Sequence, residues 1–89
     1  MEFEIFISHN LHPYTLKVYL FYNSNQLMRY KVFGKKGFIV LQNNFPFLQS
    51  TKKQRSKISW KLIEGEIKET RLLNDIIIQL ERELSHMKY

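Results

Sequence analysis

The sequence predicts an α+β domain: an antiparallel five-stranded meander, forming an open sheet or a partly closed barrel, with one C-terminal amphipathic helix packed on it. Two observations predict this class. Apolar and polar residues alternate over most of residues 2–64, which is the period of β-strands. Over residues 69–87 apolar residues recur every three or four positions, which is the period of an α-helix. Because 89 residues is the length of one domain, we expect residues 1–89 to form a single unit.

The first two strands are predicted at residues 2–8 and 14–22. We expect Pro13 to interrupt the ladder between them, because proline has no N–H donor. The second strand gathers its apolar side chains on one face. These are Tyr14, Leu16, Val18, Leu20 and Tyr22.

A third strand is predicted at residues 27–33, and the turn before it decides which residues face the core. A three-residue loop with Asn25 in the left-handed region brings the apolar residues of both strands to one face. A two- or four-residue loop would place Leu20 opposite Arg29, which a buried face does not accept. The expected pairs are therefore Tyr22 with Met28, Leu20 with Tyr30, and Val18 with Val32.

The remaining strands are predicted at residues 38–42 and 58–64, and the helix at residues 69–87. Between these two strands we expect an irregular extended stretch followed by a polar loop, residues 43–57. The apolar residues of the helix form a stripe about as wide as that of a helix lying on a core. They are Leu72, Leu73, Ile76, Ile77, Leu80, Leu84 and Met87.

Charge and cysteine content narrow the function class. The chain has no cysteine and a net charge of +6. Residues 1–63 carry ten Lys and Arg residues against two acids, Glu2 and Glu4, which favours a polyanionic partner. The absence of cysteine and of a long apolar run favours a cytoplasmic protein without a membrane partner.

Catalytic residues are not evident, so we expect a non-enzymatic protein without catalytic residues, cofactor or small-molecule substrate. Asp75 is the only aspartate and lies within the predicted helix. Glu64 and Glu66 share a strand face, but an acidic solvated junction explains them better than acid–base chemistry. His9 and His12 would need a third ligand to hold a metal, so no metal site is expected.

A nucleic-acid-binding surface is the leading functional hypothesis. The predicted register places aromatic and basic residues together on the face opposite the core, as in proteins that bind single-stranded nucleic acid. That face would hold Lys17, Tyr19, Phe21, Arg29, Lys31 and Phe33. A basic loop would add phosphate contacts from Lys52, Lys53 and Arg55. The alternatives are that the rings pack under lysine stems and that the loop is simply solvated.

A protein-interaction module is the second hypothesis. Ile78 projects away from the apolar stripe of the helix, between Arg71 and Arg82. Such a residue could contact a second copy of the chain, or a larger macromolecule to which this protein docks as a subunit or inhibitor. We therefore keep a homodimer or another protein partner as the alternative to nucleic acid.

Overall fold

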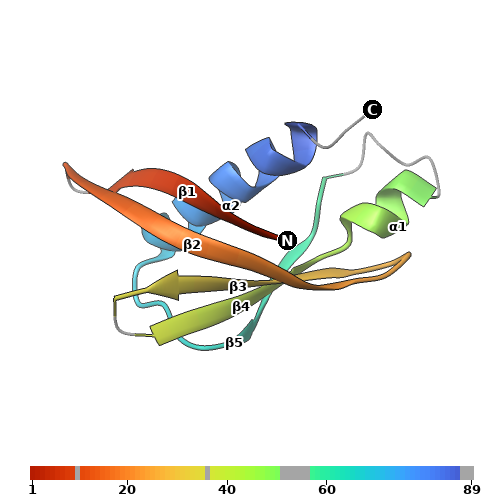
Figure 1. Cartoon of the computed structure of the whole chain (residues 1–89), viewed down its shortest axis with the longest axis horizontal. Helices are drawn as coiled ribbons and strands as arrows, with labels where there is room; N and C mark the ends of the chain where they lie inside the picture. Colours follow the sequence, from red (N-terminus) through yellow and green to blue (C-terminus); the bar gives the residue numbers. More distant parts are fainter. Residues whose placement is uncertain (10, 36, 51–56, 87–89) are drawn as a thin grey trace.

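Five antiparallel strands form one sheet in the order β1-β2-β3-β4-β5 in the computed structural model of the protein (Figure 1). The structure describes residues 1–9, 11–35, 37–50 and 57–86. The strands are β1 (Glu2–His9), β2 (His12–Asn23), β3 (Met28–Gly34), β4 (Gly37–Asn43) and β5 (Trp60–Glu64). The predicted meander is confirmed, and it is an open sheet: in the part of the chain described, β1 and β5 are its two edges.

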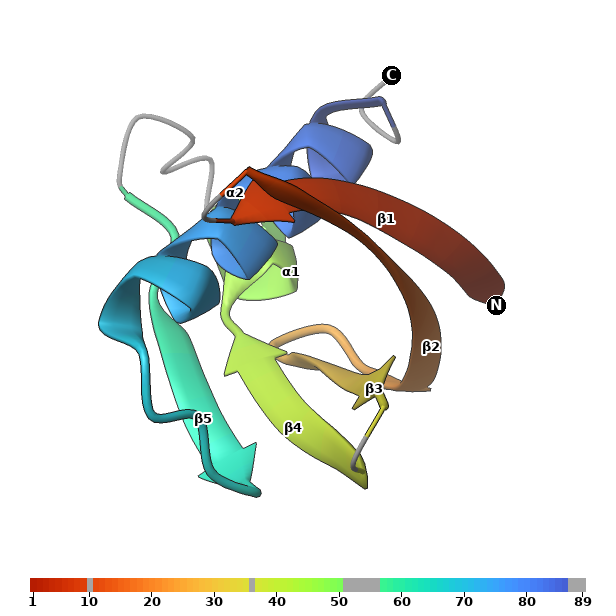
Figure 2. The same ribbon diagram turned by 90° about the vertical axis from the view of Figure 1, so that its left-hand side faces the viewer.

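The C-terminal helix α2 (Thr70–His86) lies in the hollow of the curved sheet (Figure 2). Its residues Ile76, Leu80 and Leu84 are at most 2% exposed and join the same cluster as the inward-facing strand residues. The predicted apolar stripe of this helix therefore covers the sheet, as expected. Burying a side chain of this size contributes about 1.5–3 kcal/mol, so this stripe ties the helix to the sheet.

The β1–β2 hairpin extends further than predicted. Pro13 lies within β2 and pairs with Ser8, so the prediction that it interrupts the ladder is wrong. β2 begins to pair with β3 only at Lys17. Pro13 therefore lies where no strand on the other side requires its missing N–H, which is how a sheet tolerates proline.

The β2–β3 hairpin differs from the predicted register at one end. Val18 pairs with Val32 and Leu20 with Tyr30, as predicted. Beyond them a β-bulge shifts the register, so that Arg29 pairs with Tyr22 and Met28 with Asn23. The loop has four residues, 24–27, and the bulge compensates for the extra one. Asn25 does not have a positive φ; Leu11 is the non-glycine residue that does, among those described.

A short helix, α1 (Phe45–Ser50), replaces part of the irregular stretch that was predicted after β4. The Asn43 side chain accepts a hydrogen bond from the Phe45 backbone N–H at 2.9 Å, and the Asn44 carbonyl accepts one from Leu48. Asparagine side chains favour such helix starts, and Pro46 falls in the first turn, where proline is tolerated. β5 consequently begins at Trp60, two residues later than predicted.

Candidate nucleic-acid interface

The convex side of β2, β3 and β4 carries the candidate site. Both helices lie on the concave side of the sheet in Figure 2, so neither covers it. We call the aromatic and basic residues of this side the outer face. They are Lys17, Tyr19, Phe21, Tyr22, Arg29, Lys31, Phe33 and Phe38. All six sheet residues predicted for nucleic-acid binding are in this set, and the structure brings them together on three adjacent strands.

Five aromatic side chains of the outer face remain accessible to solvent. Their exposed fractions are 44% for Tyr19, 40% for Phe21, 43% for Tyr22, 41% for Phe33 and 40% for Phe38. Single exposed apolar residues are normal on protein surfaces, whereas a contiguous group is typical of a binding site. These five lie on neighbouring positions of paired strands, so they form such a group.

The bulge in β2 adds Tyr22 to this side. Phe21 and Tyr22 both fall opposite Arg29, because a bulge sets two residues against one. The guanidinium carbon of Arg29 lies 5.0 Å from the Tyr22 ring centroid, and its Nε donates to Gln42 Oε1 at 2.8 Å. Arg29 is therefore fixed in place over an exposed ring. The predicted position of Tyr22 on the core face is wrong.

Lys31 occupies the middle of the outer face. Its Nζ lies 5.3 Å from the Phe21 ring centroid and 5.2 Å from that of Phe38. Phe38 also packs against Phe33, with ring centroids 5.7 Å apart and planes inclined by 50°. Cation–π contacts at exposed sites are worth about 0.5–1 kcal/mol each. The lysine thus lies against its neighbouring rings, as in the alternative interpretation, yet the rings stay about two-fifths exposed.

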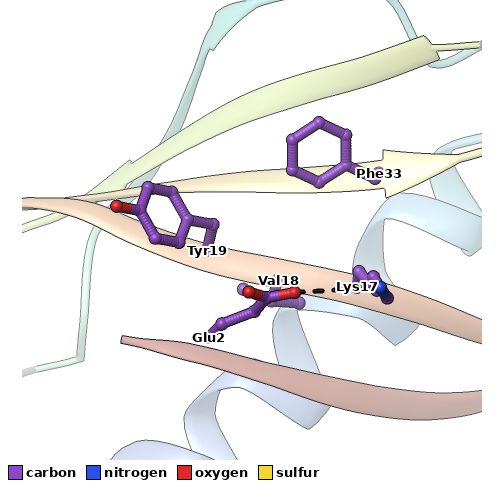
Figure 3. Close-up of a pocket in the computed structure, with 5 residues that line it drawn as sticks. All are labelled: Glu2, Lys17, Val18, Tyr19 and Phe33. Atoms are coloured by element: carbon purple, nitrogen blue, oxygen red, sulfur yellow. Dashed lines mark ion pairs between the residues drawn. The ribbon is translucent and has the colours of Figure 1, made fainter.

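A shallow pocket of about 350 Å³ lies at the β1 side of the outer face (Figure 3). It is lined by Glu2, Lys17, Val18, Tyr19 and Phe33. Lys17 Nζ and Glu2 Oε1 are 3.9 Å apart, and both side chains are more than half exposed. An exposed pair at this distance contributes little to stability, so both groups remain available to a ligand.

The other predicted site residues do not join the outer face. Lys52, Lys53 and Arg55 lie outside the described residues, so their phosphate contacts stay a prediction. Ile78 is 50% exposed on α2, on the opposite side of the sheet from the outer face. Arg71 and Arg82 on the same helix are also exposed. The helix and the outer face are therefore two separate surfaces.

Sequence reasoning missed Phe38 and Glu2 as site residues. Phe38 pairs with Phe33 across β3 and β4, and its period-two relation to Val40 was the available signal. Glu2 reaches the site because β1 pairs with β2 so that Glu2 lies opposite Tyr19. That register depends on the hairpin turn, which the prediction had made longer.

Comparison with other proteins adds no functional information. No known protein family, curated protein or solved structure matches this chain. Within the described ranges, no helix is long and apolar enough to span a membrane. Nor do three or more metal-binding side chains come together in that part of the chain. The outer face itself is the basis on which a function can be proposed.

Proposed function

We propose that the protein is a non-enzymatic module that binds single-stranded RNA or DNA through the outer face. One observation carries the proposal: five rings, each about 40% exposed, surround two cations on an uncovered sheet surface. Bases stack on aromatic rings while cations contact phosphates, and each stacked base is worth about 1–3 kcal/mol. Even two occupied rings would therefore give measurable binding.

The outer face favours a single strand over a duplex. In a duplex the faces of the bases are stacked on one another, so rings on a protein surface cannot reach them. The outer face offers rings on a convex sheet, with Arg29 and Lys31 among them. A flexible single strand can lay its bases on such a surface and direct its phosphates toward these cations.

The roles of the residues follow from their positions. We expect Tyr19, Phe21 and Phe33, together with Tyr22 and Phe38, to stack on bases. Lys17, Arg29 and Lys31 would contact phosphates or base edges. A cytoplasmic location is part of the proposal, because a small chain without cysteine suits a reducing compartment.

The test is a titration of labelled single-stranded and duplex RNA and DNA, followed by fluorescence anisotropy from low to physiological salt. We expect tighter binding to single strands, with a substantial part of the affinity retained at physiological salt, because stacking is not screened. Equal binding to duplexes that disappears with salt would show only the general attraction of a basic protein for a polyanion. That result, or no binding, would reject the proposal and direct attention to a protein partner.

A further inference from the structure

The pocket of Figure 3 has the features of a seat for one nucleobase. The view is from the convex side, with α2 behind the strands, and the rings of Tyr19 and Phe33 are seen face-on. Tyr19 and Phe33 lie on adjacent strands, at positions diagonal to each other in the register. Glu2 and Lys17 lie beside them at the β1 side. A base lying on either ring would thus direct one edge toward a carboxylate and an ammonium group.

The Glu2 carboxylate is available to a ligand. Its distance of 3.9 Å to Lys17 Nζ exceeds hydrogen-bond length, so this contact does not use its acceptor capacity. An ionised carboxylate only accepts hydrogen bonds, and its two oxygens can accept two parallel N–H groups. Lys17 only donates. The pocket therefore presents two adjacent acceptors next to a donor.

The Watson–Crick edge of guanine complements this arrangement. It presents two adjacent donors, N1–H and N2–H, beside the acceptor O6. Adenine and cytosine present one amino group next to an acceptor nitrogen, and uracil presents one N–H between two carbonyl oxygens that a carboxylate repels. Proteins that recognise unstacked bases combine stacking with hydrogen bonds to this same edge.

We propose that the pocket selects guanine, with Glu2 accepting hydrogen bonds from N1–H and N2–H, Lys17 donating to O6, and Tyr19 or Phe33 stacking on the base. This inference rests on the proposed function and adds base preference to it. Bidentate base contacts discriminate by about 1–3 kcal/mol. Because both side chains are largely exposed, we expect the lower end, which is about a fivefold preference.

The experiment compares single-stranded RNAs of about eight nucleotides, a length that small single-strand-binding domains cover. Each RNA is uridine except for one central nucleotide, which is guanosine, adenosine, cytidine or uridine. Wild-type protein should bind the guanosine RNA about fivefold more tightly than the uridine RNA. Glu2→Gln should remove that preference while leaving the affinity for the uridine RNA within about twofold, since stacking and phosphate contacts persist.

Glu4→Gln is the matched control. Glu4 lies on the same strand and face and loses the same charge, but it does not line the pocket. The preference for guanosine should survive this change. Equal affinity of the wild type for all four RNAs would overturn the guanine assignment while the proposed function stands. Loss of the preference in Glu4→Gln as well as Glu2→Gln would overturn it too, because general charge would then be the cause. No binding to any of the RNAs would overturn both proposals.

Discussion

The guanidinium of Arg29 lies over the ring of Tyr22, with Cζ 5.0 Å from the ring centroid. The two residues meet because the bulge after Leu20 shifts the β2–β3 register by one position. Without the bulge, Tyr22 would alternate to the core side. The irregularity therefore extends the outer face by one ring and holds a cation beside it.

Tyr22→Ala should weaken binding of single-stranded RNA by about 1–3 kcal/mol, the contribution of one stacked base. Its effect on the free energy of unfolding should be about 1 kcal/mol or less, because the ring is 43% exposed and its cation–π contact is weak. Anisotropy titration and urea denaturation measure the two quantities. Phe47→Ala is the control: Phe47 is 40% exposed but lies on α1, and its removal should leave the affinity unchanged. An equal loss of affinity in the two variants would contradict the role of Tyr22.

The Trp60–Glu81 hydrogen bond should contribute to stability. Trp60 Nε1 donates to Glu81 Oε2 at 2.8 Å and so joins β5 to α2. Hydrogen bonds to charged groups are worth about 1.5–3 kcal/mol, less where solvent competes. Trp60→Phe and Glu81→Gln should each lower the free energy of unfolding, and a double-mutant cycle by urea denaturation should give a coupling of about 1 kcal/mol. Strictly additive losses would show that the pair does not interact.

Gly65→Ala should destabilise the fold. Gly65 has φ +91°, and an added Cβ would lie 2.8 Å from the Phe38 carbonyl oxygen and 2.9 Å from Ile39 Cγ2. Strained backbone costs about 1–3 kcal/mol, and the close contact with backbone adds to it, so we expect a loss of about 2–4 kcal/mol.

Gly34→Ala is the matched control for this substitution, because an added Cβ there would meet only the Gly37 carbonyl oxygen at 3.9 Å. Its effect on the urea midpoint should be small. Similar losses for the two variants would contradict the packing described around Gly65.

The buried Tyr30 hydroxyl should make stability fall at alkaline pH. Burial, with a smaller contribution from the nearby charge of Glu83, raises the pKa of Tyr30 from 10.0 to about 12. As pH rises from about 10 to about 12, the unfolded chain loses this proton first, so the folded state is progressively disfavoured. The slope from one such group is at most about 1.4 kcal/mol per pH unit.

Tyr30→Phe isolates this effect from the lysines, which titrate in the same range. Its stability at neutral pH should change by about 1 kcal/mol or less, because the hydroxyl contacts only Met28 Sδ, at 3.8 Å, among the described residues. Urea denaturation at increasing pH should show a shallower decline for Tyr30→Phe than for the wild type. Parallel declines would mean that Tyr30 does not titrate in this range.

Alternation of side chains made most of the sheet predictable. A buried face permits only one register, so Val18 opposite Val32 could be inferred from the need to keep Leu20 away from Arg29. The same argument failed at the end of the hairpin, because a four-residue loop with a bulge satisfies it as well as a three-residue loop does. Tyr22 was therefore assigned to the wrong face.

Local hydrogen bonds decided the features that periodicity could not predict. Helix α1 is too short to show a helical repeat, and it begins where the Asn43 side chain accepts from the Phe45 N–H. An asparagine followed by proline in the first turn was the available signal. The Glu2–Lys17 pocket needed the β1–β2 register, which a proline expected to interrupt the ladder had concealed.

The most direct test of the central claim is the affinity of Tyr19→Ala/Phe33→Ala for a single-stranded RNA at physiological salt, measured by anisotropy beside the wild type. Both rings are more than 40% exposed, so circular dichroism should show a folded variant. If the outer face binds by stacking, affinity should fall by at least about tenfold, since each base contributes about 1–3 kcal/mol. An unchanged affinity in the folded variant would contradict nucleic-acid binding by this surface.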